Sequence, residues 1–499
     1  MRGDTLLPTR RLRPARLVLC VLFLLGGAAR ASPDALEGAL RKLISDAGLR
    51  GAQVAVAVVS DTGRGMVSIE SDKPLKPASN QKVLTTAAAL HWLGPDYAFE
   101  TLLVASAPLR DGTIAGDVTL RGGADPNISG RFFGGDATAL LRDWSRRLRN
   151  AGLRRIQGDL IADDTLFDDV RFPEAWDPRQ AAAWYSAQVS ALSLNDNCLD
   201  VTVRPASVPG RPARVEITPR CPLIEVVGAP ETVIAGKTQV ILHRRPGTNQ
   251  VVISGRIAFR APPWSGNVTI DDPALVFGST LAETLREAGI QLEGRVRKAQ
   301  RSPAPPDGAD RTGKAPGRTV LVRHTSTLLE DLPVIQKRSQ NLHAEMLLRL
   351  MGVRAAGEGS ARGGAEAIRK YLEKKGIPAE GLVVSDGSGL SHENRVTAVL
   401  LARVLHSVRP EKHFAAYLES FPVAGKDGTL ERRFLPPSPL HGTLHAKTGY
   451  IRQVSCLSGY IVKGERIWSF AVLVNGLTGG TAPAKRLQEK ILERVHAAM

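Results

Sequence analysis

The order of apolar and polar residues along the chain predicts a protein that mixes helices and strands. Short apolar segments with the spacing of strands lie near both ends, at residues 53–59, 65–70, 454–460 and 467–474. A longer run from Ser79 to Leu93, closed by Gly94, is rich in Ala, Leu and Val and predicts a buried helix. Residues 482–498 have the pattern of an amphipathic helix packed on a sheet. We therefore expect an α+β fold.

The middle of the chain has a different pattern. Residues 99–267 alternate strand-like segments with turns, at 102–105, 118–120, 159–162, 199–203, 239–242 and 251–257. The pattern becomes helical again at 274–288, and the Pro- and Gly-rich stretch 303–317 predicts a loop. We interpret residues 99–267 as a mostly β insertion of one or two domains. The surrounding residues, 32–98 and 268–499, then form one discontinuous domain.

The first 31 residues have the features of a cleaved signal peptide. Arginines at positions 10, 11, 13 and 16 precede an apolar stretch, Leu17–Leu25, that is too short to span a bilayer. Ala29-Arg30-Ala31 fits a small-x-small cleavage site. No other segment is long and apolar enough to be a membrane anchor. We expect a soluble protein that is exported to the periplasm.

The net charge narrows the range of partners. The chain carries a formal charge of +17, and about +12 remains once the six arginines and one aspartate of the leader are removed. For an exported protein, nucleic acid is not an expected partner, whereas an anionic cell envelope is. Six arginines cluster at positions 142, 146, 147, 149, 154 and 155. We interpret them as a solvated helix face in preference to a binding site for envelope polymers.

Three cysteines remain after removal of the leader. Cys198 and Cys221 flank a hairpin-like stretch and are a possible disulfide in an oxidising compartment. Cys456, within an apolar strand, is expected to be a buried free thiol. The ten histidines form no cluster with metal-ligand spacing, and no Gly-x-Ser-x-Gly elbow is present. We therefore expect no metal and no cofactor.

The strongest chemical signal is Ser79-Asn80-Gln81-Lys82, at the start of the predicted helix. Positions three apart share a helix face, so the Lys82 amine is expected next to the Ser79 hydroxyl. Serine is a poor nucleophile unless a nearby base removes its proton. Lysine can serve as that base if burial lowers its pKa towards neutrality. A solvated lysine at a polar helix start is the alternative.

Two further motifs follow in the chain. Ser339-Gln340-Asn341 precedes a strongly helical run; Ser-x-Asn also occurs at Ser193 and Ser265, and a simple N-cap serine is the alternative for Ser339. Lys447-Thr448-Gly449 occurs once, and its lysine is expected on a strand edge, where the glycine permits close backbone approach. This ordered triplet is typical of penicillin-binding proteins and serine β-lactamases.

Nearly all of the mature chain resembles one family, the penicillin-binding protein 4 type of D-alanyl-D-alanine carboxypeptidase and endopeptidase. The resemblance rests on the three motifs and on segments 77–87, 386–391, 394–397 and 425–430. His392 departs from the family pattern, where an arginine is expected. The resemblance implies a serine β-lactamase/DD-peptidase (transpeptidase-like) fold with a large insertion. The 260 residues between Ser79 and Ser339 agree with such an insertion.

The resemblance also implies roles for individual residues. Ser79 would be the nucleophile and Lys82 its base, Ser339 would relay a proton, and Asn341 would orient Lys82 and the peptide. The substrate-binding positions would be Lys447, Thr448, Gly449 and Tyr450, with the backbone N–H groups of Ser79 and Tyr450 holding the oxyanion. In the insertion, Asp177 or Tyr185 would contact the side chain of the stem peptide.

The function expected from this resemblance is hydrolysis of D-alanyl-D-alanine bonds in peptidoglycan stem peptides, and of D-alanyl cross-links, through an acyl-enzyme that β-lactams also form. Two alternatives remain: a serine β-lactamase and a non-catalytic protein that binds the cell wall.

Overall fold

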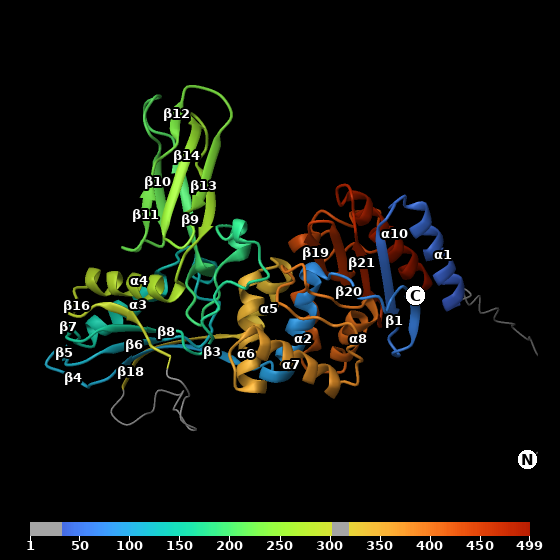
Figure 1. The fold of residues 1–499 in the computed structure, drawn as a ribbon, viewed down its shortest axis with the longest axis horizontal. Coiled ribbons are helices and arrows are strands. Elements are labelled where there is room, and N and C mark those ends of the chain that lie inside the picture. Colours follow the sequence, from blue (N-terminus) through green and yellow to red (C-terminus); the bar gives the residue numbers. More distant parts are fainter. Residues whose placement is uncertain (1–31, 302–318) are drawn as a thin grey trace, which may run out of the picture.

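The computed structural model describes residues 32–301 and 319–499 (Figure 1). The predicted signal peptide, residues 1–31, and the predicted loop 303–317 lie outside the described residues. Within the described ranges, no helix is both long enough and apolar enough to cross a membrane.

A five-stranded antiparallel sheet forms the centre of the first domain, in the order β19-β20-β21-β1-β2. Its strands are β1 (Gln53–Val59), β2 (Gly65–Ile69), β19 (Leu444–Ile451), β20 (Val454–Lys463) and β21 (Arg466–Asn475). All four strand segments predicted near the two ends of the chain belong to this sheet. Strand β19, which carries Lys447, is an edge strand as predicted.

Helices cover both faces of this sheet. On one face, α1 (Pro33–Asp46) and α10 (Ala482–Ala498) pack over a core that includes Val54, Val56 and Val58. On the other face lie α2 (Gln81–Leu93), α5 (Leu328–Lys337), α6 (Asn341–Ala356), α7 (Ala361–Lys374), α8 (Ala398–Val408) and α9 (Phe414–Ser420). Alternate residues of β1 therefore enter different cores, because successive side chains of a strand point to opposite faces.

The inserted region contains a second five-stranded sheet, in the order β17-β8-β6-β3-β18. Its strands are β3 (Ala98–Ala105), β6 (Val118–Arg121), β8 (Leu160–Asp163), β17 (Val296–Lys298) and β18 (Thr319–Thr327). Beside it lies a small sheet of β4 (Leu109–Arg110), β5 (Thr113–Ile114), β7 (Arg155–Ile156) and β16 (Gln291–Leu292). Helices α3 (Ala139–Asn150) and α4 (Pro273–Glu287) pack on this region. On α3, Arg142, Arg146 and Arg147 are exposed and pair with nearby aspartates, which supports a solvated helix face.

The structure corrects the predicted end of the insertion at residue 267. Phe277 on α4 and Val322 on β18 share a hydrophobic core with Leu103 on β3. Strand β18 also pairs antiparallel with β3 along its whole length, from Thr319 to Thr327. The insertion therefore runs from β3 to Thr327, and the first domain resumes at α5. A local change from strand to helix patterning does not reveal which sheet a helix covers.

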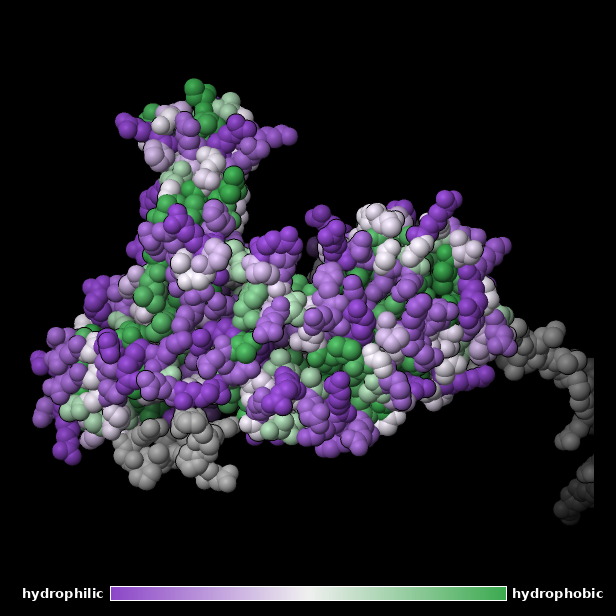
Figure 2. Space-filling view, viewed as in Figure 1, coloured by the Kyte–Doolittle hydropathy of each residue, from purple (hydrophilic) through white to green (hydrophobic). Residues whose placement is uncertain are grey.

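A slender β-unit projects from the insertion (Figure 1). One sheet consists of β9 (Cys198–Arg204), β10 (Arg214–Thr218) and β15 (Trp264–Thr269). The other consists of β11 (Glu225–Val227), β12 (Glu231–Val233), β13 (Gln239–Arg244) and β14 (Gln250–Ala258). Hydrophobic residues are visible at the tip of this unit (Figure 2). Val208 and Ile234, which lie in the sequence of this unit, are exposed.

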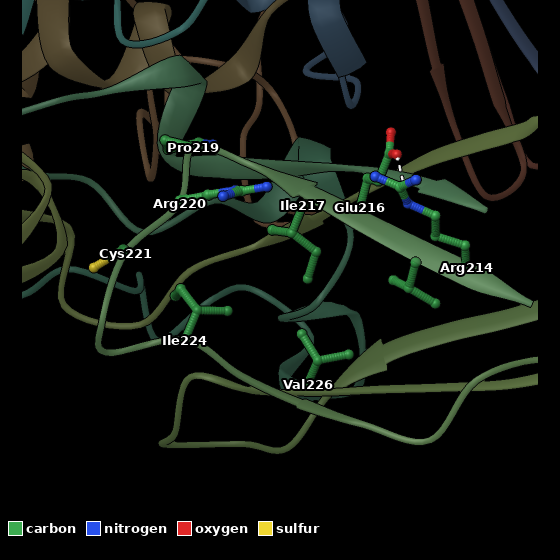
Figure 3. Close-up of a pocket in the computed structure, with 9 residues that line it drawn as sticks. Arg214, Glu216, Ile217, Pro219, Arg220, Cys221, Ile224 and Val226 are labelled. Carbon is green, nitrogen blue, oxygen red and sulfur yellow. Dashed lines mark ion pairs between the residues drawn. The ribbon is translucent and has the colours of Figure 1, made fainter. Parts of the chain in front are cut away.

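The possible disulfide between Cys198 and Cys221 is not formed, because both residues are free thiols. Cys198 belongs to the core of the first domain, whereas Cys221 belongs to the core of the projecting β-unit. Figure 3 shows Cys221 at a cavity of about 350 Å³ that Ile217, Ile224 and Val226 also line. The two thiols thus face different cores. Cys456 is a buried free thiol, as expected.

Candidate active site

Ser79 lies in a single 3-10 turn, Ala78–Asn80, immediately before α2. The predicted helix begins at Ser79, so the structure shortens its α-helical part by two residues. Ala78 has a φ of 47°, in the left-handed region, which side chains rarely adopt. Gly389 passes so close that a Cβ atom there would collide with the Ala78 carbonyl. This packing fixes the turn that presents the Ser79 hydroxyl.

Lys82 lies beneath Ser79 and is fully buried. Its Nζ is 3.0 Å from Ser79 Oγ, 2.6 Å from Asn341 Oδ1 and 2.7 Å from the Ser388 carbonyl oxygen. Burial lowers the pKa of Lys82 to about 7, against an opposing effect of the Asp386 and Glu345 carboxylates. The alternative of a solvated lysine is therefore excluded.

The partners of Lys82 suit an uncharged amine. Two of them, Asn341 Oδ1 and the Ser388 carbonyl, can only accept hydrogen bonds. A neutral amine has two N–H groups and one lone pair. In the charged form the third N–H donates to Ser79 Oγ at 3.0 Å. In the uncharged form the two N–H groups can bind the other two oxygens, which leaves the lone pair for the Ser79 hydroxyl. This is the arrangement that a general base needs.

A buried loop positions the Ser388 carbonyl. Glu345 on α6 accepts hydrogen bonds from the backbone N–H groups of Gly387, at 3.1 Å, and Ser388, at 2.8 Å. Asp386 accepts from the N–H groups of Gly389, at 2.7 Å, and Ser391, at 2.6 Å. Glu345 therefore ties the loop to α6, and Asp386 fixes the conformation of the loop.

Trp176, in the insertion, also donates its indole N–H to Asp386, at 2.9 Å. The loop of the first domain is therefore anchored partly by the inserted region.

The second motif lies between α5 and α6. Ser339 has a φ of 60°, another left-handed conformation, and Asn341 is the first residue of α6. The N-cap of α6 is Gln340, so the alternative of a simple N-cap serine at position 339 is wrong. Asn341 accepts from Lys82 and donates through Nδ2 to the Tyr185 carbonyl at 2.8 Å. Its side-chain amide is thus held at both ends.

The third motif closes the site from the edge strand β19. Lys447 is fully buried and donates to Ser339 Oγ at 2.9 Å and to the Thr448 carbonyl at 2.9 Å. Burial holds the pKa of Lys447 well below its ordinary value, and the nearby Lys82 amine lowers it further. The Thr448 hydroxyl lies 2.8 Å from that of Thr429. Tyr450 is exposed, with 68% of its surface accessible.

Gly449 permits the close approach that the sequence predicted. A Cβ atom at this position would lie 2.6 Å from Asn80 Nδ2 and 2.8 Å from the Pro77 carbonyl oxygen. Real Cβ atoms do not approach other atoms so closely. Strand β19 can therefore lie directly against the turn that carries Ser79.

The two substrate contacts suggested in the insertion have different surroundings. Asp177 is partly exposed and forms an ion pair with Arg179 at 2.8 Å. The Asp177 side chain also accepts from the Arg179 backbone N–H, so both of these interactions are local. Tyr185 lies beside the site, since its carbonyl binds Asn341. A contact between either residue and a stem peptide stays a prediction.

The sequence assigned no role to several residues that build this site. Glu345 and Asp386 hold the loop around Lys82, and Thr429 extends the hydroxyl row from Thr448. The only signal was that Asp386-Gly387-Ser388 and Gly428-Thr429 fall in segments of family resemblance. Among the described residues, no group of three or more His, Cys, Asp or Glu side chains is arranged to hold a metal ion.

The fold and the site together define a penicillin-binding DD-peptidase. A model of the D-Ala-D-Ala carboxypeptidase 3 (S13) family matches residues 36–496, and the chain belongs to this family. A D-alanyl-D-alanine carboxypeptidase of Actinomadura sp. (strain R39) is 34% identical over 475 residues, which cover 91% of this chain and 84% of the relative. The carboxypeptidase DacB of Haemophilus influenzae is 26% identical over 428 residues, covering 83% of this chain and 84% of the relative.

The fold is also that of a solved structure. The crystal structure of penicillin binding protein 4 (dacB) from Haemophilus influenzae has a TM-score of 0.77 at 22% identity and covers 92% of this chain and 99% of that chain. These comparisons confirm the predicted family and the predicted fold class. They make the protein a hydrolase of the D-Ala-D-Ala carboxypeptidase type, with peptidoglycan as its substrate.

Proposed function

We propose that the protein is a serine DD-peptidase that works through an acyl-enzyme on Ser79, trims terminal D-alanine, and also cleaves D-alanyl cross-links in an exported, periplasmic location. One observation carries the proposal: a buried lysine with a pKa of about 7 lies 3.0 Å from a serine hydroxyl, between two acceptor oxygens. The arginines, apolar stretch and cleavage site of residues 1–31 support export.

The first chemical step forms the acyl-enzyme. Lys82 takes the proton of the Ser79 hydroxyl, and Ser79 Oγ attacks the carbonyl carbon of the penultimate D-alanine. The backbone N–H groups of Ser79 and Tyr450 hold the negative oxygen of the tetrahedral intermediate. Ser339 passes its proton to the leaving amine and is reprotonated by the proton that Lys82 took from Ser79; the C–N bond breaks, D-alanine departs, and Lys82 is uncharged again. Lys447, 2.9 Å from Ser339, supports this transfer.

The second step restores the enzyme. A water molecule attacks the ester carbonyl, and its proton passes to the Lys82 amine. The Ser79–acyl bond breaks, Ser79 Oγ takes the proton back from Lys82, and the shortened peptide acid loses its proton to solvent and leaves as a carboxylate. Asn341 keeps Lys82 in place throughout, since its Oδ1 lies 2.6 Å from Nζ.

Recognition of the terminal carboxylate falls to Lys447 and Thr448. The pKa of Lys447 is depressed in the empty site because the amine is buried near Lys82. A substrate carboxylate brings a negative charge and favours the protonated amine. The cation formed there then opposes protonation of Lys82 and keeps the base uncharged. Carboxylate binding and base activation are thereby coupled.

β-Lactams mimic the same dipeptide and are expected to acylate Ser79. The Haemophilus influenzae penicillin binding protein 4 has been solved in complex with a β-lactam. Rapid deacylation needs a carboxylate that is free to activate water. The two carboxylates that act on Lys82, Asp386 and Glu345, are both occupied by backbone N–H groups. This favours a long-lived penicilloyl-enzyme over a β-lactamase.

A fluorescent penicillin tests the proposal on the purified mature protein. We expect one equivalent of label that persists for many minutes, together with release of D-alanine from a D-alanyl-D-alanine peptide. Label lost within seconds would identify a β-lactamase, and absence of label would identify a non-catalytic binding protein. Incubation with cross-linked muropeptides should also give monomers; D-alanine release without monomers would overturn the endopeptidase part.

Lys447→Ala tests carboxylate recognition. Charge-assisted hydrogen bonds to a carboxylate are among the strong ones, so we expect kcat/KM for a free-acid peptide to fall about 10- to 100-fold beyond the loss for its C-terminal amide. The amide is the matched control, because it keeps the scissile bond and removes the charge. An equal fall for both substrates would show that Lys447 does not bind the carboxylate.

A further inference from the structure

A turn of the inserted region enters the first domain behind the second motif. Asn195, Asp196 and Asn197 all have left-handed backbones, with φ values of 52°, 56° and 53°. Three consecutive non-glycine residues in this region are strained and persist only where their surroundings fix them. Asn195 donates to Asp200 at 2.9 Å, and Asn197 donates to the Gln188 carbonyl at 2.9 Å.

The strained turn brings the Asp196 carboxylate to the middle residue of the second motif and to the helix that follows the motif. Its Oδ2 accepts from Gln340 Nε2 at 2.7 Å and from Arg131 at 2.6 Å. Its Oδ1 lies 3.1 Å from Nε2 of His343. Gln340 is the middle residue of the motif, and His343 is two residues beyond Asn341 on α6.

His343 lies between two carboxylates. Its Nδ1 is 2.5 Å from Asp331 Oδ1 on α5, and its Nε2 faces Asp196. An ionised carboxylate only accepts hydrogen bonds, so both ring nitrogens must carry protons to satisfy both partners. The His343 ring and the Asp331 side chain have no exposed surface, which makes this a buried aspartate–imidazolium–aspartate chain.

We propose that Asp196, His343 and Asp331 form a positioning device that fixes the orientation of the Ser339 and Asn341 side chains. Because Asp196 belongs to the inserted region, that region then controls the rate of acylation. The proposal rests on the proposed function of Ser339 and Asn341. Ser339 itself is left-handed, so its hydroxyl direction depends on the contacts that hold the motif. Gln340, held by Asp196, lies between the two functional residues, and α6, held by His343, begins at Asn341.

The charges around His343 agree with this arrangement. Its pKa is raised to about 9, because the attraction of Asp331 and Asp196 outweighs the effect of burial. Arg131 donates to both oxygens of Asp196, at 3.2 Å to Oδ1 and at 2.6 Å to Oδ2. Asp200 also attracts Arg131, and Asp331 acts on Asp125 of the insertion. Since the folded pKa exceeds the ordinary 6.5, the imidazolium stabilises the fold below pH 6.5. This contribution is lost as the pH rises through about 9.

The test compares Asp196→Asn and His343→Gln with the parent protein, and uses His324→Gln as the matched control. His324 also lies near an aspartate, Asp125, at 3.5 Å, but on β18 and away from the motif. The acylation rate constant and the dissociation constant of the first complex are measured separately by stopped-flow with a fluorescent penicillin, from pH 6 to 10.

We expect the acylation rate constant of both variants to fall about 10- to 100-fold, with the dissociation constant changed less than about threefold, because small misplacements of catalytic groups cost rate. The parent protein should lose acylation above about pH 9, and His343→Gln should lack that loss. His324→Gln should match the parent. Rate constants within twofold of the parent, or an unchanged alkaline limb in His343→Gln, would overturn the proposal.

Two further measurements keep the result interpretable. Gln340→Ala removes a single hydrogen bond to Asp196 and leaves the buried aspartate–imidazolium–aspartate chain intact. It therefore tests the positioning device even if His343→Gln does not fold. We expect slower acylation in this variant too, and an unchanged acylation rate would contradict the role of Asp196. Ser79→Ala separates the two proposals. If it still labels, the proposed function fails; if it does not label while the His343 and Asp196 variants acylate normally, only this inference fails.

Discussion

Ser79→Ala is expected to abolish acylation. The substitution removes the only atom that forms the proposed ester and leaves Lys82 without its hydroxyl partner at 3.0 Å. We expect labelling by a fluorescent penicillin, and release of D-alanine, to fall by at least about a thousandfold, to background. Intact-mass spectrometry after incubation with penicillin measures this directly, because the parent protein gains the mass of one penicilloyl group.

Ser391→Ala is a suitable control for this experiment. Its backbone N–H, not its hydroxyl, binds Asp386, so the loop bond survives the substitution. This variant should still gain one adduct. Persistence of an adduct in Ser79→Ala would show that another residue is the nucleophile and would remove the basis of the mechanism.

The second large effect concerns Lys82 and pH. At its ordinary pKa of 10.5, about one lysine in three thousand is uncharged at pH 7. With a pKa of about 7, half of the Lys82 amines are uncharged at that pH. Only the uncharged form can accept the Ser79 proton, so acylation should fall about tenfold per pH unit below pH 7 and level off between about pH 7 and about pH 9.

Lys82→Ala should lower the acylation rate constant by about 100- to 10,000-fold, which is the usual range for loss of a general base. Lys82→Arg is the informative companion, because guanidinium keeps a positive charge and cannot act as a base at these pH values. Both variants should keep only residual acylation, and this residual rate should lack the acid limb near pH 7. An active Lys82→Arg, or a parent profile that stays flat down to pH 5, would show that Lys82 is not the base.

Residue patterns were sufficient to predict the sheet of the first domain and its catalytic motifs. Ser79 and Lys82 are three apart on one helical turn, so their contact is local. Lys447 was expected on an edge strand that reaches the site, and Gly449 allows that approach. The family resemblance then implied that Ser339 and Asn341 join them.

Long-range packing accounts for what the sequence could not reveal. Helix α4 has an ordinary helical pattern, and nothing in it states that its partner sheet is the inserted one. Asp196 directly follows Ser193-Leu194-Asn195, a copy of the second motif that is not part of the catalytic site. Its contact with His343 depends on three left-handed residues in a row, a conformation that no residue type at these positions predicts.

The hydrogen bonds that join the insertion to the first domain limit how the protein can be shortened. Trp176 and Asp196 are attached, across the domain boundary, to Asp386 and His343. Deleting the insertion would remove the indole donor of the buried Asp386 carboxylate and one counter-ion of the buried His343 imidazolium. Buried polar or charged groups that lose their partners destabilise a fold. The insertion therefore cannot be removed or replaced without destabilising the first domain. A shortened enzyme would first need neutral, apolar replacements at both attachment points.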